Sequence, residues 1–127
     1  MVSGASGFVG GALLEMLAKD QRFEVRGLVR PRSDVSHLSQ NVIGLIKVLG
    51  DSGDEVVEEV IGYKPDFLVH TATYFHAEHK VSDIKLISRS VIEFGNHLLE
   101  GLSKLDNKPV FINTGTSWQH FSNTDSF

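Results

Sequence analysis

The sequence of 127 residues contains no cysteine. Disulfides, a thiol nucleophile and thiolate metal ligands are therefore excluded, and the composition fits a reducing compartment. No apolar run approaches the roughly 18 residues that a membrane span requires, and neither a secretory signal nor a lipidation motif is visible. We therefore expect a cytoplasmic protein that does not interact with a membrane.

Basic residues are too few for a protein that binds nucleic acid. The chain has 12 Lys and Arg against 16 Asp and Glu, which gives a net charge of −4. Nucleic-acid phosphates are bound by clustered Lys and Arg, so the sequence argues against nucleic acid as the main partner. A hydrophobic content of 41% is ordinary for one globular domain with a core. The expected ligand is a small molecule.

A glycine-rich turn lies at the start of the chain, where Gly4, Gly7 and Gly10 are spaced as G-x-x-G-x-x-G. Residues 11–19 favour a helix, and residues 23–30 alternate like a strand. Turn, helix and strand in this order form a dinucleotide-binding unit, in which the helix N-terminus faces a pyrophosphate. Taken alone, the glycine triplet is equally consistent with a simple tight turn.

Strands and helices alternate along the rest of the chain. The patterns predict a short helix at 35–40, a strand at 41–49, a helix at 54–61 capped by Ser52 or Asp54, a strand at 67–72, a helix at 81–105 and a strand at 110–113. This alternation indicates a single α/β domain over residues 1–127 with a Rossmann-type, doubly wound parallel sheet. The expected strand order is 3-2-1-4-5.

The first strand is predicted to be short. Only Met1 and Val2 precede Ser3, whereas a buried strand has about five or six residues. We therefore expect the domain to be truncated at this end and marginally stable, because backbone groups of the neighbouring strands would be unpaired. Restoring about five apolar residues before Val2 is expected to raise the unfolding midpoint, and an unchanged midpoint would contradict this placement of the strand.

Several short motifs occur in an order that is typical of one family. They are the glycine loop at 3–11, Leu-Val-Arg-Pro at 28–31, Gly-Asp at 50–51, the run at 65–72, the Leu-Leu-Glu of the long helix, and Asn-Thr-Gly-Thr-Ser at 113–117. Together they resemble the N-terminal half of an extended short-chain dehydrogenase/reductase of the NAD-dependent epimerase/dehydratase family. Residues 113–120 further resemble bacterial nucleotide-sugar members. The resemblance implies an enzyme with an NAD or NADP cofactor and a nucleotide-sugar substrate, and it allows a homodimer.

The resemblance also implies which residues contact the cofactor. They are Gly4, Ser6, Gly7, Phe8, Val9 and Gly10 in the pyrophosphate loop, Arg30 at the adenosine ribose, Asp51 and Ser52 at the adenine, and Ala72 and Thr73 at the nicotinamide-side ribose. Arg30 and Arg32, with no acid at this strand end, favour NADP, because a guanidinium pairs with a 2′-phosphate. Alternatively, Arg30 is a solvated charge and Asp51 shapes a turn.

The catalytic pair of the family is missing from this sequence. Members pair a tyrosine with a lysine four residues later, which lowers the pKa of the phenol so that it can exchange a proton near neutrality. Here Tyr63 and Tyr74 are followed at that spacing by Phe67 and Glu78. We expect the pair to lie beyond the last residue of the chain and the 127-residue chain to have no turnover.

Other residues of the family pattern are uncertain or absent. The hydroxyl that hydrogen-bonds the reacting group falls on Thr116 or Ser117, which could equally be turn residues. The asparagine usual in the long helix is missing from residues 90–92.

Two further groups of residues have alternative interpretations. His76 and His79 are a candidate metal pair, but no third ligand is evident, and a substrate contact or a solvated loop fits as well. We therefore expect no metal site. The aromatic group near the end of the sequence, Trp118, His120 and Phe121, has two interpretations. It forms either the rim of a sugar pocket or a surface that the missing half of the protein would cover. Besides an enzyme, the sequence allows a non-catalytic dinucleotide sensor or a purely structural domain, although the intact glycine loop counts against the latter.

Overall fold

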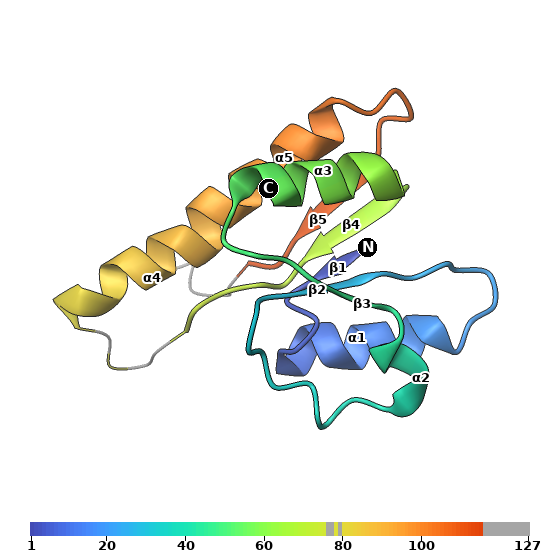
Figure 1. The fold of residues 1–127 in the computed structure, drawn as a ribbon, viewed down its shortest axis with the longest axis horizontal. Helices are drawn as coiled ribbons and strands as arrows, with labels where there is room; N and C mark the ends of the chain where they lie inside the picture. The colour runs from blue at the N-terminus through green and yellow to red at the C-terminus, as the bar shows by residue number, and fades with distance from the viewer. Residues whose placement is uncertain (76–77, 79, 116–127) are drawn as a thin grey trace, which may run out of the picture.

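The computed structural model describes residues 1–75, 78 and 80–115. Its elements in chain order are β1 (Val2–Ser3), α1 (Phe8–Ala18), β2 (Gly27–Val29), α2 (Gln40–Ile43), β3 (Ile46–Val48), α3 (Gly53–Tyr63), β4 (Phe67–His70), a 3-10 turn η1 (Val81–Asp83), α4 (Ile84–Ser88), a π-helical turn η2 (Arg89–Glu93), α5 (Phe94–Ser103) and β5 (Val110–Asn113) (Figure 1). The five strands form one parallel sheet in the order β3-β2-β1-β4-β5. This Rossmann-type α/β topology is the one expected from the sequence.

The central strand β1 divides the core into two clusters. Successive strand residues point to opposite faces of a sheet, and Met1 and Leu28 accordingly belong to one cluster while Val2 and Val29 belong to the other. The first cluster packs against α3 and α5 through Val56, Val60, Leu98 and Leu102. The second packs against α1 and α2 through Leu14 and Val42. Helices on both faces make the sheet doubly wound.

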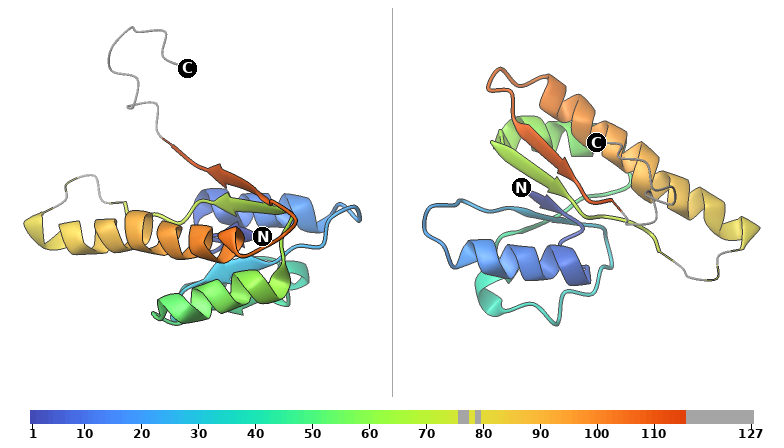
Figure 2. Two further views of the ribbon diagram at one scale, coloured as in Figure 1. Left: turned by 90° about the horizontal axis from the view of Figure 1, so that it is seen from above. Right: turned by 180° about the vertical axis from the view of Figure 1, so that it is seen from behind.

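The helices α3 and α5 lie side by side on one face of the sheet (Figures 1 and 2). They come close together at Gly101, where a Cβ atom would lie 2.7 Å from the Cβ of Val60. Only a residue without a side chain fits at this contact. On the opposite face, β4 and β5 are not covered by a helix among the described residues, and Phe67, Val110 and Ile112 are about half exposed.

The second strand is shorter than expected. The alternating pattern predicted a strand over 23–30, but only Gly27–Val29 pairs with neighbouring strands. The segment before it begins with a turn in which the N–H of Phe23 donates to the carbonyl of Asp20. Alternation alone does not make a strand, because the backbone also needs a partner strand alongside. Val25 is still buried in the α1 side of the core.

The chain between β2 and β3 also differs from the prediction. The expected helix at 35–40 is wrong: the helix α2 is Gln40–Ile43, and the strand expected at 41–49 is reduced to Ile46–Val48. Ser39 explains the shift, because its N–H and hydroxyl both donate to the carboxylate of Glu15 in α1. The anchored Ser39 is the N-cap residue of α2, and the helix begins after it. Val42, expected in a strand, is fully buried within α2.

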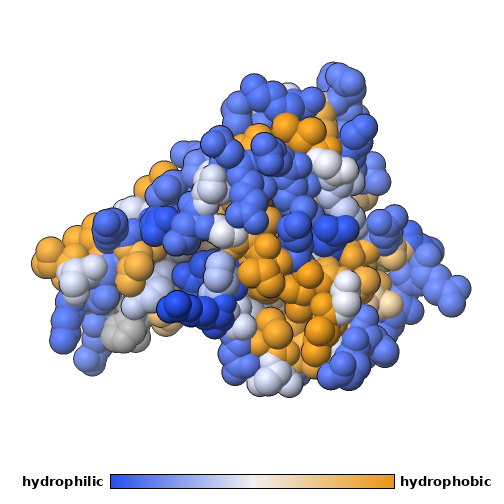
Figure 3. Space-filling view, in the orientation of Figure 1, coloured by the Kyte–Doolittle hydropathy of each residue, from blue (hydrophilic) through white to orange (hydrophobic). Residues whose placement is uncertain are grey.

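The predicted long helix is one continuous helical segment from Val81 to Ser103. Its apolar stripe faces the core only in the second half, where Phe94, Leu98, Leu102 and Leu105 pack on the α3 side. The first half extends beyond the sheet, and Val81 is 85% exposed. Figure 3 shows this end of the molecule as apolar surface at the far left. No helix among the described residues is both long and apolar enough to cross a membrane.

Candidate functional site

The glycine loop between β1 and α1 packs tightly against the end of β4. Gly4 has a φ of +73°, which side chains disfavour, and a Cβ at this position would lie 2.6 Å from the backbone nitrogen of Ala72. A Cβ at Gly10 would collide with the carbonyl oxygen of Gly4. Thr71 secures the contact by donating its hydroxyl hydrogen to the carbonyl of Ser3 at 2.6 Å. Both glycines are therefore needed for the loop to close onto β4.

The N-terminus of α1 is open toward this loop. The N-cap residue is Gly7, which offers no capping side chain, and the first turn carries no acidic residue. Within the loop, the N–H of Gly7 donates to the carbonyl of Gly4 and the N–H of Gly11 to that of Gly7. The first N–H groups of a helix have no partner within the helix, and the dipole is positive at this end. This terminus can bind an anion such as a phosphate.

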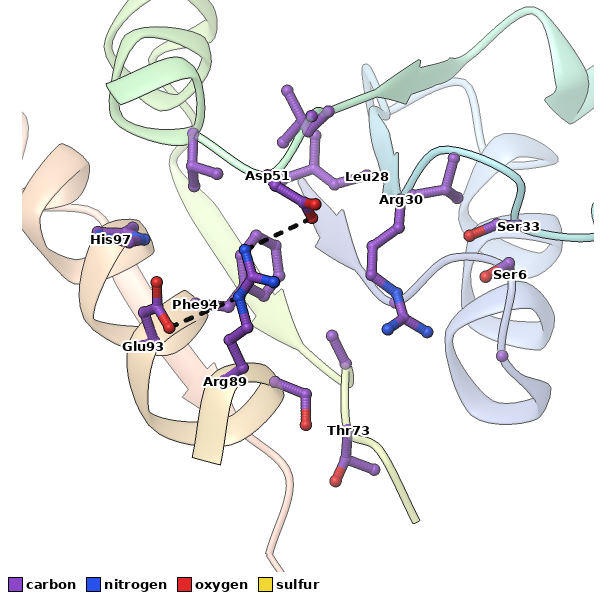
Figure 4. A pocket seen from close by; sticks show the side chains of 18 of the residues that line it. Ser6, Leu28, Arg30, Ser33, Asp51, Thr73, Arg89, Glu93, Phe94 and His97 are labelled. Atoms are coloured by element: carbon purple, nitrogen blue, oxygen red, sulfur yellow. Dashed lines mark ion pairs between the residues drawn. The ribbon is translucent and has the colours of Figure 1, made fainter. Parts of the chain in front are cut away.

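A pocket of about 260 Å³ lies beside the loop, outside the carboxyl ends of β1, β2, β3 and β4 (Figure 4). The strand order reverses at β1, and ligands of open α/β sheets bind at such a switch point. Eight of the predicted cofactor residues line it: Gly4, Ser6, Gly7, Arg30, Asp51, Ser52, Ala72 and Thr73. Phe8 and Val9 lie at the start of α1 with exposed side chains, and Gly10 is buried beneath the loop. The remaining candidates, His76, His79, Thr116, Ser117, Trp118, His120 and Phe121, lie outside the described residues.

The positive charge of Arg30 is available to the pocket. Its guanidinium points into the cavity in Figure 4, and no ion-pair partner of Arg30 is found in the described part of the chain. Arg32, the other cation considered for cofactor discrimination, is not among the pocket-lining residues. Across residues 1–75, 78 and 80–115 no group of three or more His, Cys, Asp or Glu could hold a metal ion.

The opposite wall of the pocket was not anticipated from the sequence. Arg89, Glu93 and His97 all line it. The guanidinium of Arg89 lies 3.8 Å from a carboxylate oxygen of Asp51 and 3.8 Å from one of Glu93. The spacing of these three residues puts them on one side of a helix, and this polar stripe could have been found beside the apolar stripe of the same segment.

A second link joins the helical segment to the pocket. The hydroxyl of Ser90 accepts a hydrogen bond from the N–H of Tyr74 at 2.8 Å and donates one to the carbonyl of Ile87 at 3.0 Å. Ser90 lies in the π-helical turn η2, a rare geometry that is frequent at functional sites. The link fixes the chain that follows β4, which carries Thr73 into the pocket.

A buried histidine lies beneath the site. The Nδ1 atom of His70 is hydrogen bonded to the hydroxyl of Ser3 at 2.6 Å, and its ring is near those of Phe94 and Phe111. The Nε2 atom has no partner among the described residues. Burial lowers the pKa of His70, because a charged imidazole would lose its hydration. The residue is therefore a neutral part of the core at neutral pH.

The sheet order, the glycine loop and the switch-point pocket define a Rossmann-type α/β domain. The chain belongs to the NAD dependent epimerase/dehydratase family, whose model matches residues 1–120. The resemblance found in the sequence is thus confirmed at the level of the family. No curated protein sequence matches the chain.

Solved structures share the fold. UDP-glucuronic acid 4-epimerase from Bacillus cereus, in complex with NAD, is 20% identical with a TM-score of 0.68, covering 99% of this chain and 42% of that chain. The Bordetella bronchiseptica enzyme WbmH, in complex with NAD+, is 18% identical with a TM-score of 0.65, covering 81% and 34%. UDP-glucose 4-epimerase from Thermus thermophilus, in complex with NAD, is 20% identical with a TM-score of 0.60, covering 79% and 32%. The chain therefore spans between 32% and 42% of the length of these proteins.

Proposed function

We propose that this chain binds a nicotinamide dinucleotide and is the cofactor-binding part of a nucleotide-sugar epimerase, dehydratase or reductase of the extended short-chain dehydrogenase type. Membership of the NAD dependent epimerase/dehydratase family supports this proposal. The observation that carries it is the closure of the glycine loop onto β4, with the open N-terminus of α1 beside the pocket.

The residues of the pocket fit a dinucleotide. A Cβ at Gly4 or Gly10 would fill the space that lets the loop close, so the backbone itself can approach a pyrophosphate. The N–H groups of Phe8 and Val9 at the helix start would bind the phosphate oxygens together with the loop residues Ser6 and Gly7. Because these groups are fixed before the ligand arrives, they bind with little loss of conformational entropy.

The remaining cofactor roles are those that the family resemblance implies, and the residues concerned line the pocket. Asp51 and Ser52 would contact the adenine, and Ala72 and Thr73 the ribose beside the nicotinamide. Arg30 favours NADP over NAD, since an unpaired guanidinium can form two hydrogen bonds with a 2′-phosphate. The solved relatives named above hold NAD, so the preference for NADP rests on this chain's own Arg30.

A bound nicotinamide would accept or donate a hydride at a sugar carbon. In this chain, Thr116 or Ser117 would hold the reacting hydroxyl after β5. The names of two relatives, a UDP-glucuronic acid 4-epimerase and a UDP-glucose 4-epimerase, support a nucleotide sugar as the substrate. A cytoplasmic location and a homodimer remain parts of this proposal.

Calorimetric titration of the 127-residue chain with NADP and NAD tests the proposal. We expect binding of both, with NADP tighter. Gly10→Ala, which alters the loop, should weaken the binding of both cofactors. Gly62→Ala is its matched control, because nothing lies within 4 Å of a Cβ at Gly62. Absence of binding by a chain that is shown to be folded would refute the proposal.

A non-catalytic dinucleotide sensor is the second candidate, because the glycine loop and the pocket beside it are all that such a function requires. In either case we expect this chain to bind the cofactor without turnover. Positioned acid–base groups contribute about 10²–10⁴-fold to such reactions, and the pair that would supply them is absent. Turnover is measured with NADP and UDP-sugars, by monitoring the absorbance of the reduced nicotinamide. Turnover above a blank without substrate would contradict the expectation.

A further inference from the structure

Arg89 projects from the helical wall toward the end of the pocket where β3 finishes. Its guanidinium lies 3.8 Å from Asp51, across the pocket, and 3.8 Å from Glu93, one turn along the helix. Figure 4 shows the three side chains together, with Arg30 on the other side of the cavity. Arg89 and Arg30 therefore face the same space from two different elements, the helical segment and the end of β2.

Arg89 and Arg30 differ in the charged side chains that surround them. Two carboxylates flank Arg89, so this group of three carries a net charge of about −1 and does not attract a phosphate. Arg30 has no such neighbours within the described ranges. A role in binding the anionic part of a dinucleotide thus falls to Arg30, and Arg89 needs a different one.

The shape of the guanidinium supplies that role. It is planar, weakly hydrated and stacks on aromatic rings, which an ammonium group cannot do in the same way. Oxygens of Asp51 and Glu93 lie 3.8 Å from two different nitrogens of the guanidinium, Nη2 and Nε. Because the side chains of both ion pairs are exposed, at 43% for Arg89, 79% for Asp51 and 53% for Glu93, the pairs are weak and can adjust when a ligand enters.

We propose that Arg89 is the helix-side wall of the base-binding end of the pocket and that the adenine ring lies flat against its guanidinium, beside Asp51 and Glu93. The π-helical turn that begins at Arg89 contributes to this placement, since it changes the direction in which residues before and after it project. This inference rests on the proposed dinucleotide function and assigns a residue that the family pattern does not name.

The test measures two halves of the cofactor separately. ADP-ribose carries the adenine and the pyrophosphate, and nicotinamide mononucleotide carries neither the adenine nor its ribose. We expect Arg89→Ala to weaken the binding of ADP-ribose about tenfold, the scale of a desolvated cation–π contact, and to leave the binding of nicotinamide mononucleotide unchanged. Calorimetry supplies both affinities, and thermal unfolding confirms that each variant is folded.

Arg89→Lys separates stacking from ion pairing. Lysine retains the charge and can pair with Asp51, but it lacks the planar group. If the adenine stacks on the plane of Arg89, the lysine variant remains clearly weaker than the unaltered protein, because an ammonium group lacks the planar face. Full recovery of ADP-ribose binding in Arg89→Lys would overturn the proposal in favour of an ion-pair link alone. Arg22→Ala, which removes an exposed arginine paired with Asp20 in the turn after α1, is the matched control and should change neither affinity.

Two further results would also decide the question. Tighter binding of ADP-ribose by Arg89→Ala would show that Arg89 blocks the pocket, and unchanged binding would show that it does not touch the base; either overturns the inference while the dinucleotide function stands. If the unaltered chain binds neither ADP-ribose nor NADP, the proposed function is refuted, and the role of Arg89 with it.

Discussion

The hydroxyl of Ser90 accepts a hydrogen bond from the backbone N–H of Tyr74 at 2.8 Å. The two residues lie on different elements, the π-helical turn and the chain after β4, and the contact is partly buried. Ser90 stands in the segment where the family's asparagine was expected and not found. A shorter side chain thus ties the pocket-lining chain at Thr73 to the helical wall.

Replacing Ser90 by alanine is expected to loosen this link. The N–H of Tyr74 would lose its acceptor, and its hydrogen exchange should accelerate by about 2- to 10-fold, the equivalent of one hydrogen bond of 0.5–1.5 kcal/mol. Exchange measured by NMR checks this. Ser103→Ala is the matched control, because the Ser103 hydroxyl donates only to the carbonyl of Glu100 in its own helix. Equal exchange at Tyr74 in both variants would argue against the link.

Arg30→Ala should reduce the discrimination between NADP and NAD. Loss of a charge-assisted hydrogen bond to a 2′-phosphate would narrow the difference in binding free energy by about 1.5–3 kcal/mol. The binding of NAD itself should change little, since NAD has no phosphate at that position. Titration calorimetry with the two cofactors measures the difference. Equal affinities in the unaltered protein, or the same gap in the variant, would remove Arg30 from this role.

Gly10→Ala should destabilise the domain. Its new methyl group would collide with the carbonyl oxygen of Gly4 and come within 2.6 Å of the Thr71 hydroxyl, and such overpacking costs about 1–3 kcal/mol. Gly62→Ala, in open space within α3, should instead stabilise by up to about 1 kcal/mol, because alanine favours a helix. Urea unfolding of the two variants compares the effects. A stable Gly10→Ala protein would show that the loop does not close as described.

His70 should make the fold sensitive to acid. Its pKa is lowered by burial in the folded state, so the unfolded chain binds a proton more readily than the folded one. The contribution of neutral His70 to stability is therefore complete above the unfolded value of about 6.5 and is lost as the pH falls below it. The free energy of unfolding, measured by urea between about pH 8 and pH 5, should decrease on the acid side.

Two histidine variants isolate this effect. His70→Gln cannot titrate and should flatten the acid-side decrease, whereas His37→Gln, at an exposed position, should leave it unchanged. The same slope in His70→Gln and the unaltered protein would assign the acid sensitivity to other groups.

The sheet order could be predicted because each of its signals is local. The glycine spacing from Gly4 to Gly10 marks the turn between a central strand and a helix, and the alternation that follows leaves few topologies. Strand lengths could not be predicted in the same way. Phe23 and Val25 fit a strand pattern, yet pairing depends on a neighbour that is distant in sequence. The position of α2 likewise depends on Glu15, which anchors Ser39 from another helix.

The pocket could be predicted on the side made by loops and not on the side made by the helix. Arg30 and Asp51 were identified through the family resemblance; each follows a strand, and parallel strands end at one edge, so both line the pocket. Arg89 and Ser90 lie in a helix whose polar residues are most simply read as a solvated face. The spacing of Arg89, Glu93 and His97 marks a polar stripe, but its contacts with the pocket depend on the π-helical turn and on partners at Asp51 and Tyr74 that are distant in sequence.

The close contact between Gly101 and Val60 also affects the position of Arg89 at the pocket. Arg89 lies twelve residues before Gly101 in one continuous helical segment, a distance of about 18 Å at 1.5 Å per residue. The second half of this segment packs along α3, and Gly101 is one of the places where the two helices touch. A side chain there would push the two helices apart, and a tilt of the helical segment would carry Arg89 away from Asp51. The width of the pocket is thus set in part by one missing side chain at the far end of the helix.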